Sequence, residues 1–330
     1  METIPYHLLT RIERVIDKYN LFNRNEATVA YSGGKDSLFL CKALHQMGYK
    51  VRPLIIDIGY NVSWERAIRN INRIGLPAEL INMQTIIQEY PDITKAVNSY
   101  FNEVLDIQAG KYPKASPCTP CHNAKMTILS YWAKVHDINY IATGHHGTDA
   151  ITSLLKSYFM YVDRWEYGNV TYSANNYERL IKNYRALFQL PPEDFICTKF
   201  ISSLKELLTN NSIGTDESIV NDYSGNLVIC RPLYDILEYE IVCYYKTDHV
   251  EFAVSECFVS NIRNEKKLTP REMVQYWILR NANIENQRIM INYAYECLDE
   301  EGRLLYNVRN NRKKILGGQY KNDTVNIYKL

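Results

Sequence analysis

Short apolar runs alternate along the chain with longer segments in which apolar residues recur three or four positions apart. The short runs are typical of buried parallel strands, and the longer segments are typical of helices that cover a sheet. The pattern predicts strands at 27–31, 51–58, 78–82, 139–143 and 226–229, and helices at 6–19, 63–74, 91–108, 123–136, 150–158, 270–281 and 284–298, with a further helix from about Lys35. Because repeated strand and helix units favour right-handed crossovers, we expect an α/β fold: a Rossmann-type parallel sheet of about five strands with helices on both faces, followed by a helical C-terminal region.

These elements divide the chain into three expected parts. Residues 1–25 form an N-terminal helix, residues 26–245 the α/β domain, and residues 246–330 the helical C-terminal region. The chain has no apolar run near the ~18 residues of a membrane span and no signal-peptide pattern, so we expect a cytoplasmic protein without a membrane partner.

The net charge and the number of cysteines limit the ligands and reactions to be expected. The formal net charge is +1, so a contact with nucleic acid would depend on local basic patches. Eight cysteines in a cytoplasmic chain indicate reduced thiols, a metal site or catalysis rather than a disulfide framework.

The first predicted strand runs directly into Ser-Gly-Gly-Lys-Asp-Ser. Glycines let backbone N–H groups turn toward an anion, and the helix that begins near Lys35 adds the positive end of its dipole and a full side-chain charge. The stretch therefore predicts a phosphate cradle, with a spacing that is neither a Walker A loop nor Gly-x-Gly-x-x-Gly. The candidate nucleotide contacts are Tyr31, Ser32, Gly33, Gly34, Lys35, Asp36 and Ser37.

Two other strand ends carry candidates for the same ligand, since ligands lie at the carboxyl edge of a parallel sheet. Asp57 and Ile58 are placed to contact ribose and adenine, although Asp57 can equally cap the next helix. In Gly-His-His-Gly-Thr-Asp, Gly144 would let a phosphate approach the backbone and Asp149 could hold Mg²⁺. His145 is a further candidate contact, but it and the next histidine can also pack or cap.

Three cysteines form the remaining candidate group. Cys118 and Cys121 make a Cys-x-x-Cys pair at a predicted helix start, where the helix dipole lowers thiol pKa values and favours thiolates. Cys230 ends a predicted strand whose carboxyl end should face the same edge of the sheet. Such a pair can ligate a metal, exchange disulfides or carry a persulfide.

The chain carries four motifs in a fixed order: SGGKDS, Cys-x-x-Cys, GHH, and Cys-Arg-Pro-Leu before a Glu-x-Glu-Ile helix. They resemble the motifs of the PP-loop ATP pyrophosphatases, an adenine nucleotide α-hydrolase-like (HUP-like) superfamily. Within it they resemble the TtcA/TtuA group of tRNA 2-thiolation enzymes, over roughly residues 25 to 260. The resemblance implies strand order 3-2-1-4-5, ATP and Mg²⁺ as cofactors, and a [4Fe-4S] cluster. It makes Cys118, Cys121 and Cys230 the cluster ligands, and these cysteines, Lys35 and Asp36 the catalytic residues.

The same resemblance implies an ATP-dependent sulfur transfer. A carbonyl oxygen of the substrate, on a tRNA base, would attack the α-phosphate, pyrophosphate would leave, and sulfur from a donor would displace AMP. A homodimer is compatible with this scheme. Three alternatives stay open: a small-molecule acceptor such as a purine or a peptide, persulfide chemistry at Cys118 and Cys121 without a cluster, and a non-catalytic ATP-binding sensor.

The chain departs from this group in three places. Thr148 stands where the superfamily's second motif has its first aspartate, and the paired zinc-binding cysteine motifs are absent. Residues 158–224 form a longer connection than in TtcA-type enzymes, rich in tyrosine and arginine. This aromatic and basic segment could stack a base and hold phosphates, or form a helical lid. The basic run Gly302 to Lys314 is a candidate phosphate contact or a solvated segment.

Overall fold

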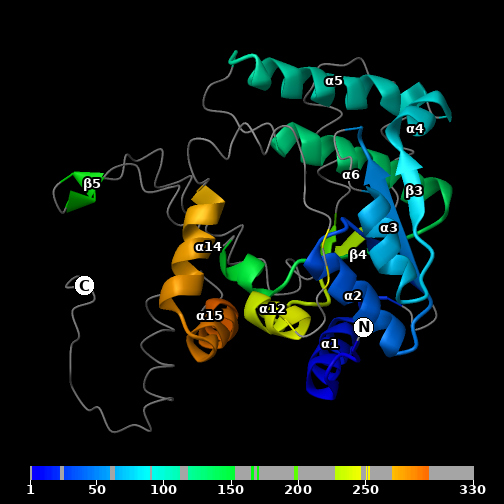
Figure 1. Ribbon diagram of the computed structural model, residues 1–330. Helices are drawn as coiled ribbons and strands as arrows, with labels where there is room; N and C mark the ends of the chain where they lie inside the picture. The colour runs from blue at the N-terminus through cyan, green and yellow to red at the C-terminus, as the bar shows by residue number, and fades with distance from the viewer. Residues whose placement is uncertain are drawn as a thin grey trace, which may run out of the picture. The chain divides into compact units, whose positions relative to one another are not determined.

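A computed structural model (Figure 1) describes residues 2–22, 26–59, 64–89, 91–111, 118–152, 165–166, 169–170, 197–199, 227–246, 250, 252 and 270–296. The chain forms two units. One comprises Met1–Ala150 with Glu193–Met273, and the other comprises Ile151–Pro192 with Val274–Leu330. All the predicted nucleotide contacts and the three candidate cysteines fall within the first unit.

A six-stranded sheet is at the centre of the first unit, in the order β3-β2-β1-β4-β8-β7. The parallel strands are β1 (Ala27–Ala30), β2 (Val51–Asp57), β3 (Glu79–Asn82), β4 (Tyr140–Thr143) and β8 (Val228–Cys230). The five-stranded parallel sheet and its 3-2-1-4-5 order are therefore confirmed. The sixth strand, β7 (Cys197–Lys199), is an antiparallel edge strand in the 158–224 segment and was not predicted.

Seven helices of the described chain belong entirely to this first unit. They are α1 (Tyr6–Tyr19), α2 (Lys35–Gln46), α3 (Trp64–Asn72), α4 (Met83–Glu89), α5 (Pro91–Gln108), α6 (Cys118–Val135) and α12 (Glu238–Lys246). In addition, residues 147–152 are helical. Because the strand order changes direction after β3, right-handed crossovers put α2 and α3 on one face and the α4–α6 group on the other (Figure 1).

Each face of the sheet buries its own apolar layer. On the α6 face, side chains of four strands and of α6 form one core: Leu54, Ile81, Ile141, Ile229, Ile128, Leu129 and Trp132. On the other face the ring of Phe39 from α2 packs edge-on against Tyr244 and Tyr245 of α12, with centroids 5.4 and 6.4 Å apart. The two layers fix α2 and α12, which flank the predicted cradle, against the sheet and each other.

Helix α6 begins at Cys118, whereas the sequence pattern predicted a start at Asn123. Pro120 does not prevent the earlier start, because the first turn of a helix has no intrahelical partner for the N–H group that proline lacks. Cys118 and Cys121 consequently lie in the first turn of the helix rather than in the loop before it. At this i, i+3 spacing they share one helix face.

A partly buried group of ion pairs holds helix α1 against the rest of the first unit. Arg11 lies 2.6 Å from Glu240 Oε1 and 3.2 Å from Asp235 Oδ2. The guanidinium therefore fixes α1 to the start of α12 and to the loop that precedes it, because a forked donor binds two carboxylates at once.

In the second unit the described elements are few. Strands β5 (Trp165–Glu166) and β6 (Asn169–Val170) form an antiparallel ribbon. Helix α14 (Pro270–Asn281) enters this unit at Val274 and is followed by α15 (Ile284–Glu296). The sequence-based bounds of α14 are confirmed, and α15 ends two residues before the predicted Leu298.

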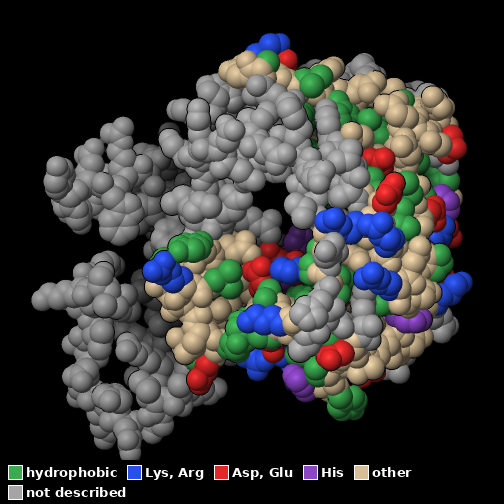
Figure 2. Space-filling view, in the orientation of Figure 1, with side chains coloured by type: hydrophobic (Ala, Val, Ile, Leu, Met, Phe, Trp, Pro, Cys, Tyr) green, Lys and Arg blue, Asp and Glu red, His purple; other side chains and the backbone are tan. Residues whose placement is uncertain are grey.

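The described surface is electrostatically mixed. On the face shown in Figure 2, basic side chains lie in several groups among acidic ones, in keeping with the formal net charge of +1. None of the helices in the described ranges is long and apolar enough to cross a membrane. The basic run Gly302 to Lys314 and most of the 158–224 segment lie outside the described residues.

Candidate active site

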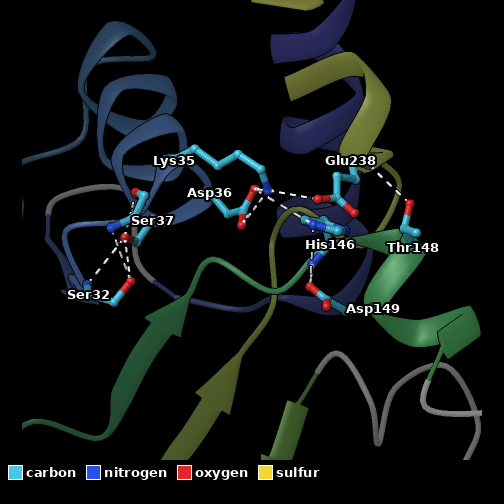
Figure 3. Close-up of polar contacts among 9 residues, drawn as sticks. Ser32, Lys35, Asp36, Ser37, His146, Thr148, Asp149 and Glu238 are labelled. Carbon is cyan, nitrogen blue, oxygen red and sulfur yellow. Dashed lines mark hydrogen bonds and ion pairs between the residues drawn. The ribbon is translucent and has the colours of Figure 1, made fainter. Parts of the chain in front are cut away.

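The predicted cradle is a tight loop closed by the hydroxyl of Ser37 (Figure 3). Ser37 Oγ donates to Gly34 O at 3.1 Å and accepts from Ser32 N at 3.2 Å, and the Oγ atoms of Ser32 and Ser37 are 3.0 Å apart. Gly33 has φ of 78°, a left-handed conformation that glycine adopts without strain. The loop thus ends at Lys35, the first residue of α2. The backbone N–H groups of the first turn of α2 have no partner within the helix and point out of its end.

The Gly-His-His segment closes directly over this loop. A Cβ atom at Gly144 would lie 2.7 Å from Ser37 N, 2.8 Å from Asp36 C and 2.9 Å from Ser37 Cα. Real Cβ atoms do not approach backbone this closely, so only glycine fits the observed packing. His145 next to it turns back, with Nδ1 2.9 Å from Thr143 Oγ1. The two phosphate motifs predicted from sequence are therefore in contact through their backbones.

Lys35 extends across the site between two carboxylates. Its Nζ lies 2.8 Å from Asp36 Oδ1 and 3.1 Å from Glu238 Oε1, the latter on the first residue of α12. Burial would lower the pKa of Lys35, but the charges and hydrogen bonds of Asp36 and Glu238 outweigh it and raise the pKa. Lys35 is therefore a fixed positive charge at neutral pH.

His146 lies next to the carboxylates of both Asp36 and Asp149 (Figure 3). The buried imidazole Nε2 of His146 is 3.7 Å from Asp36 Oδ1 and 3.5 Å from Asp149 Oδ2. Asp149 Oδ2 also accepts the backbone N–H of His146 at 3.2 Å, which caps the helical turns that follow. Asp149, the predicted Mg²⁺ ligand, is thus close to the cradle through His146 and not through a direct contact with Lys35.

At the ends of β1 and β2, the side chains of the predicted nucleotide contacts are already engaged within the protein. The hydroxyl of buried Tyr31 donates to Ala67 O at 3.0 Å, so this residue can present only its backbone to a ligand. Asp57 Oδ1 accepts the N–H of Gly59 at 2.8 Å and thereby shapes the turn after β2. The side chain of Ile58 is buried in the core on the α6 face, which leaves its backbone as the possible contact.

The described side chains of Cys121 and Cys230 lie on different faces of the sheet. Cys121 is half-buried and packs on the core that contains Ile229, whereas the fully buried Cys230 donates Sγ–H to Leu21 O at 3.3 Å. Since neighbouring residues of a strand point to opposite faces, the thiol of Cys230 points away from the face on which Cys121 packs. For Cys118 the backbone position alone is described.

The two cysteine segments are nevertheless neighbours. The side chain of His122 is exposed, but partial desolvation of its ring lowers its pKa, and the positive charges of Lys125 and of Arg231, which follows Cys230, lower it further. Within the described ranges no three His, Cys, Asp or Glu side chains form a metal site. The [4Fe-4S] cluster therefore stays a prediction, and it would need the thiolates of Cys121 and Cys230 on one side.

Two residues of the site had no role assigned from sequence. Glu238 was noted only as part of a Glu-x-Glu-Ile pattern, yet its carboxylate contacts Lys35. Thr148 was noted as a departure from an aspartate, yet its Oγ1 accepts the backbone N–H of Glu238 at 3.1 Å and caps α12. An N-capping hydroxyl has a recognisable sequence preference when it lies beside its helix, but here the cap comes from a segment ninety residues away.

Several known proteins are similar to this chain, although no protein-family model matches it. A tRNA-5-methyluridine(54) 2-sulfurtransferase of Pyrococcus horikoshii is 25% identical over 253 residues, which are 75% of this chain and 61% of that protein. A tRNA-cytidine(32) 2-sulfurtransferase of Geotalea uraniireducens is 27% identical over 207 residues, 59% of this chain and 74% of that protein. The chain thus spans less than two thirds of the length of the Pyrococcus horikoshii protein.

Among solved structures, the U34-tRNA thiolase NcsA of Methanococcus maripaludis, determined with its [4Fe-4S] cluster, superposes with a TM-score of 0.52 at 14% identity. The match covers 96% of this chain and 82% of that chain, and it shows that the fold is shared. By sequence this chain is a homologue of tRNA 2-thiolation enzymes, and it shares the Rossmann-like α/β fold of the solved thiolase.

Proposed function

We propose that this chain is an ATP-dependent tRNA sulfurtransferase that activates a base carbonyl by adenylation. The observation that supports this most is the closed loop at the carboxyl end of β1, with Lys35 at the start of α2 and Gly144 packed against the loop backbone. Such a site favours a polyphosphate, and the relatives that share the motifs are named as tRNA sulfurtransferases.

In the first step the loop and the N-terminal end of α2 would hold the phosphates of ATP. A carbonyl oxygen of the base attacks the α-phosphorus, the bond from that phosphorus to the bridging oxygen breaks, and pyrophosphate leaves with the electron pair. Lys35, whose raised pKa keeps it positively charged, would neutralise the charge that develops on pyrophosphate. Carboxylate oxygens suit Mg²⁺, so Asp149 is the candidate to hold an ATP-bound ion.

In the second step the thiolate of Cys121 takes the outer sulfur of a sulfane donor, whose thiol leaves, and forms a persulfide. The outer sulfur attacks the activated carbon, a C–S bond forms, and the C–O bond to AMP breaks. The thiolate of Cys118 then attacks Sγ of Cys121, the S–S bond of the adduct breaks to release the thiocarbonyl, and an added thiol reduces the Cys118–Cys121 disulfide that remains. The thiols of Cys118 and Cys121 are the proposed sulfur-handling groups, because the first turn of α6 stabilises thiolates through the helix dipole. The [4Fe-4S] cluster stays a prediction from sequence, since it requires the thiol of Cys230 to turn away from Leu21 O. No step above depends on it.

The experiment that tests the function combines the protein with unmodified tRNA, ATP, Mg²⁺, a sulfane-sulfur donor and a thiol reductant. We expect pyrophosphate release that depends on tRNA, and a 2-thionucleoside in the digested tRNA by mass spectrometry. Thiolation of a purine or peptide in place of tRNA would identify a small-molecule enzyme. ATP binding without pyrophosphate release under any of these conditions would identify a sensor and end the proposal.

Single cysteine replacements test how sulfur is handled. Cys121→Ser is expected to lower thionucleoside formation by ~10²-fold or more while pyrophosphate release changes by less than about threefold, because serine is a far weaker nucleophile than a thiolate. Cys230→Ser, whose hydroxyl can still donate to Leu21 O, is expected to retain thiolation within about fivefold. Cys243→Ser, on half-buried Cys243 of α12, is the matched control.

Iron and acid-labile sulfide, measured after anaerobic purification, give the decisive second readout. A content near four of each per chain, lost together with activity in both Cys121→Ser and Cys230→Ser, would show that Cys230 turns to join a three-cysteine cluster. That result would replace the two-thiol interpretation.

A further inference from the structure

The carboxylate of Glu238 occupies the position in which an anionic ligand would pair with the ammonium group of Lys35. The carboxylate comes from the first residue of α12, and Figure 3 shows it opposite the Lys35 side chain, which reaches toward it from α2. The 3.1 Å contact is partly buried, with 15% of the Glu238 side chain and 27% of the Lys35 side chain exposed. At this exposure, solvent screens the pair less than an ordinary surface ion pair.

The ammonium of Lys35 is already heavily used in the absence of a ligand. It has three N–H donors, and its neighbours are both oxygens of Asp36, at 2.8 and 3.0 Å, and the carboxylate of Glu238. A phosphate oxygen that bonds Lys35 must therefore take a donor from one of these carboxylates. The carboxylate that keeps its place would also repel the phosphate.

Of the two carboxylates, Glu238 is the easier one to displace. Asp36 faces a second partner, His146, and sits on the same helical turn as Lys35. The backbone of Glu238 is fixed independently of its side chain, because its N–H binds Thr148 Oγ1 and the preceding N–H of Leu237 binds Glu240 Oε2 at 2.9 Å. Its side chain can therefore rotate away from Lys35 while α12 stays in place.

We propose that Glu238 is a displaceable counter-ion of Lys35: the phosphates of the nucleotide replace it, and it returns to Lys35 as pyrophosphate leaves. This inference rests on the proposed function, and it adds a residue that tunes phosphate affinity and product release. Because Glu238 competes for the same ammonium, its charge weakens the binding of every ligand that uses Lys35. Its removal must then tighten binding, which is the opposite of what the loss of a supporting residue would do.

The test measures inorganic pyrophosphate binding to the full chain by titration calorimetry. We expect Glu238→Gln to lower the dissociation constant about tenfold, since it removes a competing charge while keeping the side-chain shape. Glu240→Gln is the matched control: it makes the same change of charge on the same helical turn, but Glu240 binds Arg11 and not Lys35. We expect its dissociation constant to stay within about twofold of the wild-type value.

An unchanged or weaker affinity in Glu238→Gln, with Glu240→Gln like the wild type, would overturn the counter-ion role. If Glu238→Gln is unstable in thermal unfolding, Glu238→Asp serves instead: its shorter side chain lengthens the contact with Lys35 and is expected to tighten binding by a smaller factor, and an unchanged constant would overturn the role equally. A wild-type protein that binds neither pyrophosphate nor ATP would refute the proposed function itself, which is a different outcome from wild-type binding that Glu238→Gln leaves unaltered.

Discussion

Replacing Lys35 with alanine is expected to slow tRNA-dependent pyrophosphate release by ~10²-fold or more. The ammonium group of Lys35 lies between the carboxylates of Asp36 and Glu238, and its raised pKa keeps it charged throughout the neutral range. Without it, the charge on the leaving pyrophosphate would be stabilised by the loop and helix end alone. We expect the free energy of unfolding to change by no more than about 1 kcal/mol, because the ion pairs are partly exposed.

Lys50→Ala is the matched control for this measurement. Lys50 is an exposed lysine directly before β2, at the amino-terminal edge of the sheet, whereas Lys35 follows β1 at the carboxyl edge. The control removes the same charge from the same unit and should release pyrophosphate within about twofold of the wild-type rate. Equal rates for wild type and Lys35→Ala would mean that this loop is not the ATP site.

The order of the sheet and most element bounds could be predicted because they depend on local patterns. α1 has the predicted bounds: it follows Pro5 and ends where Asn20 adopts a left-handed conformation, with φ of 47°. Helix α5 and strand β2 are equally clear, since α5 keeps a helical period along its length and β2 is a short, nearly continuous apolar run. In contrast, β7 has three residues and pairs only at the sheet edge, too short for any period to show.

The parts of the phosphate site that follow directly after strands could be predicted from the sequence. SGGKDS and GHH follow β1 and β4, which are adjacent in the sheet, so their meeting at Gly144 follows from the topology. The contact from Lys35 to Glu238 was not predictable, because it depends on how α12 packs against α2. The direction of Cys230 was equally hidden, since a shift of one residue in the pairing of β8 would turn its thiol to the other face.

Gly144→Ala is expected to weaken ATP binding by about tenfold or more and to destabilise the fold by ~1 to 3 kcal/mol. The added Cβ would meet backbone atoms at the start of α2, at 2.7 to 2.9 Å, and backbone cannot rotate aside as a long side chain can. Either the GHH segment or the first turn of α2 must move, and the cradle opens as it does. Equilibrium denaturation and nucleotide titration measure the two effects separately.

Gly34→Ala supplies the comparison that separates a packing effect from a ligand effect. A Cβ at Gly34 would have only an ordinary contact, 3.4 Å from Ser32 Oγ, and the backbone φ of −80° suits alanine. We therefore expect this variant to lose no more than about 1 kcal/mol of stability, yet to bind ATP at least tenfold more weakly, because the methyl group would occupy the space that a phosphate needs beside the loop. Normal ATP binding by Gly34→Ala would show that the phosphates do not approach this part of the loop, whereas normal stability of Gly144→Ala would show that the GHH segment can move away from α2 without cost.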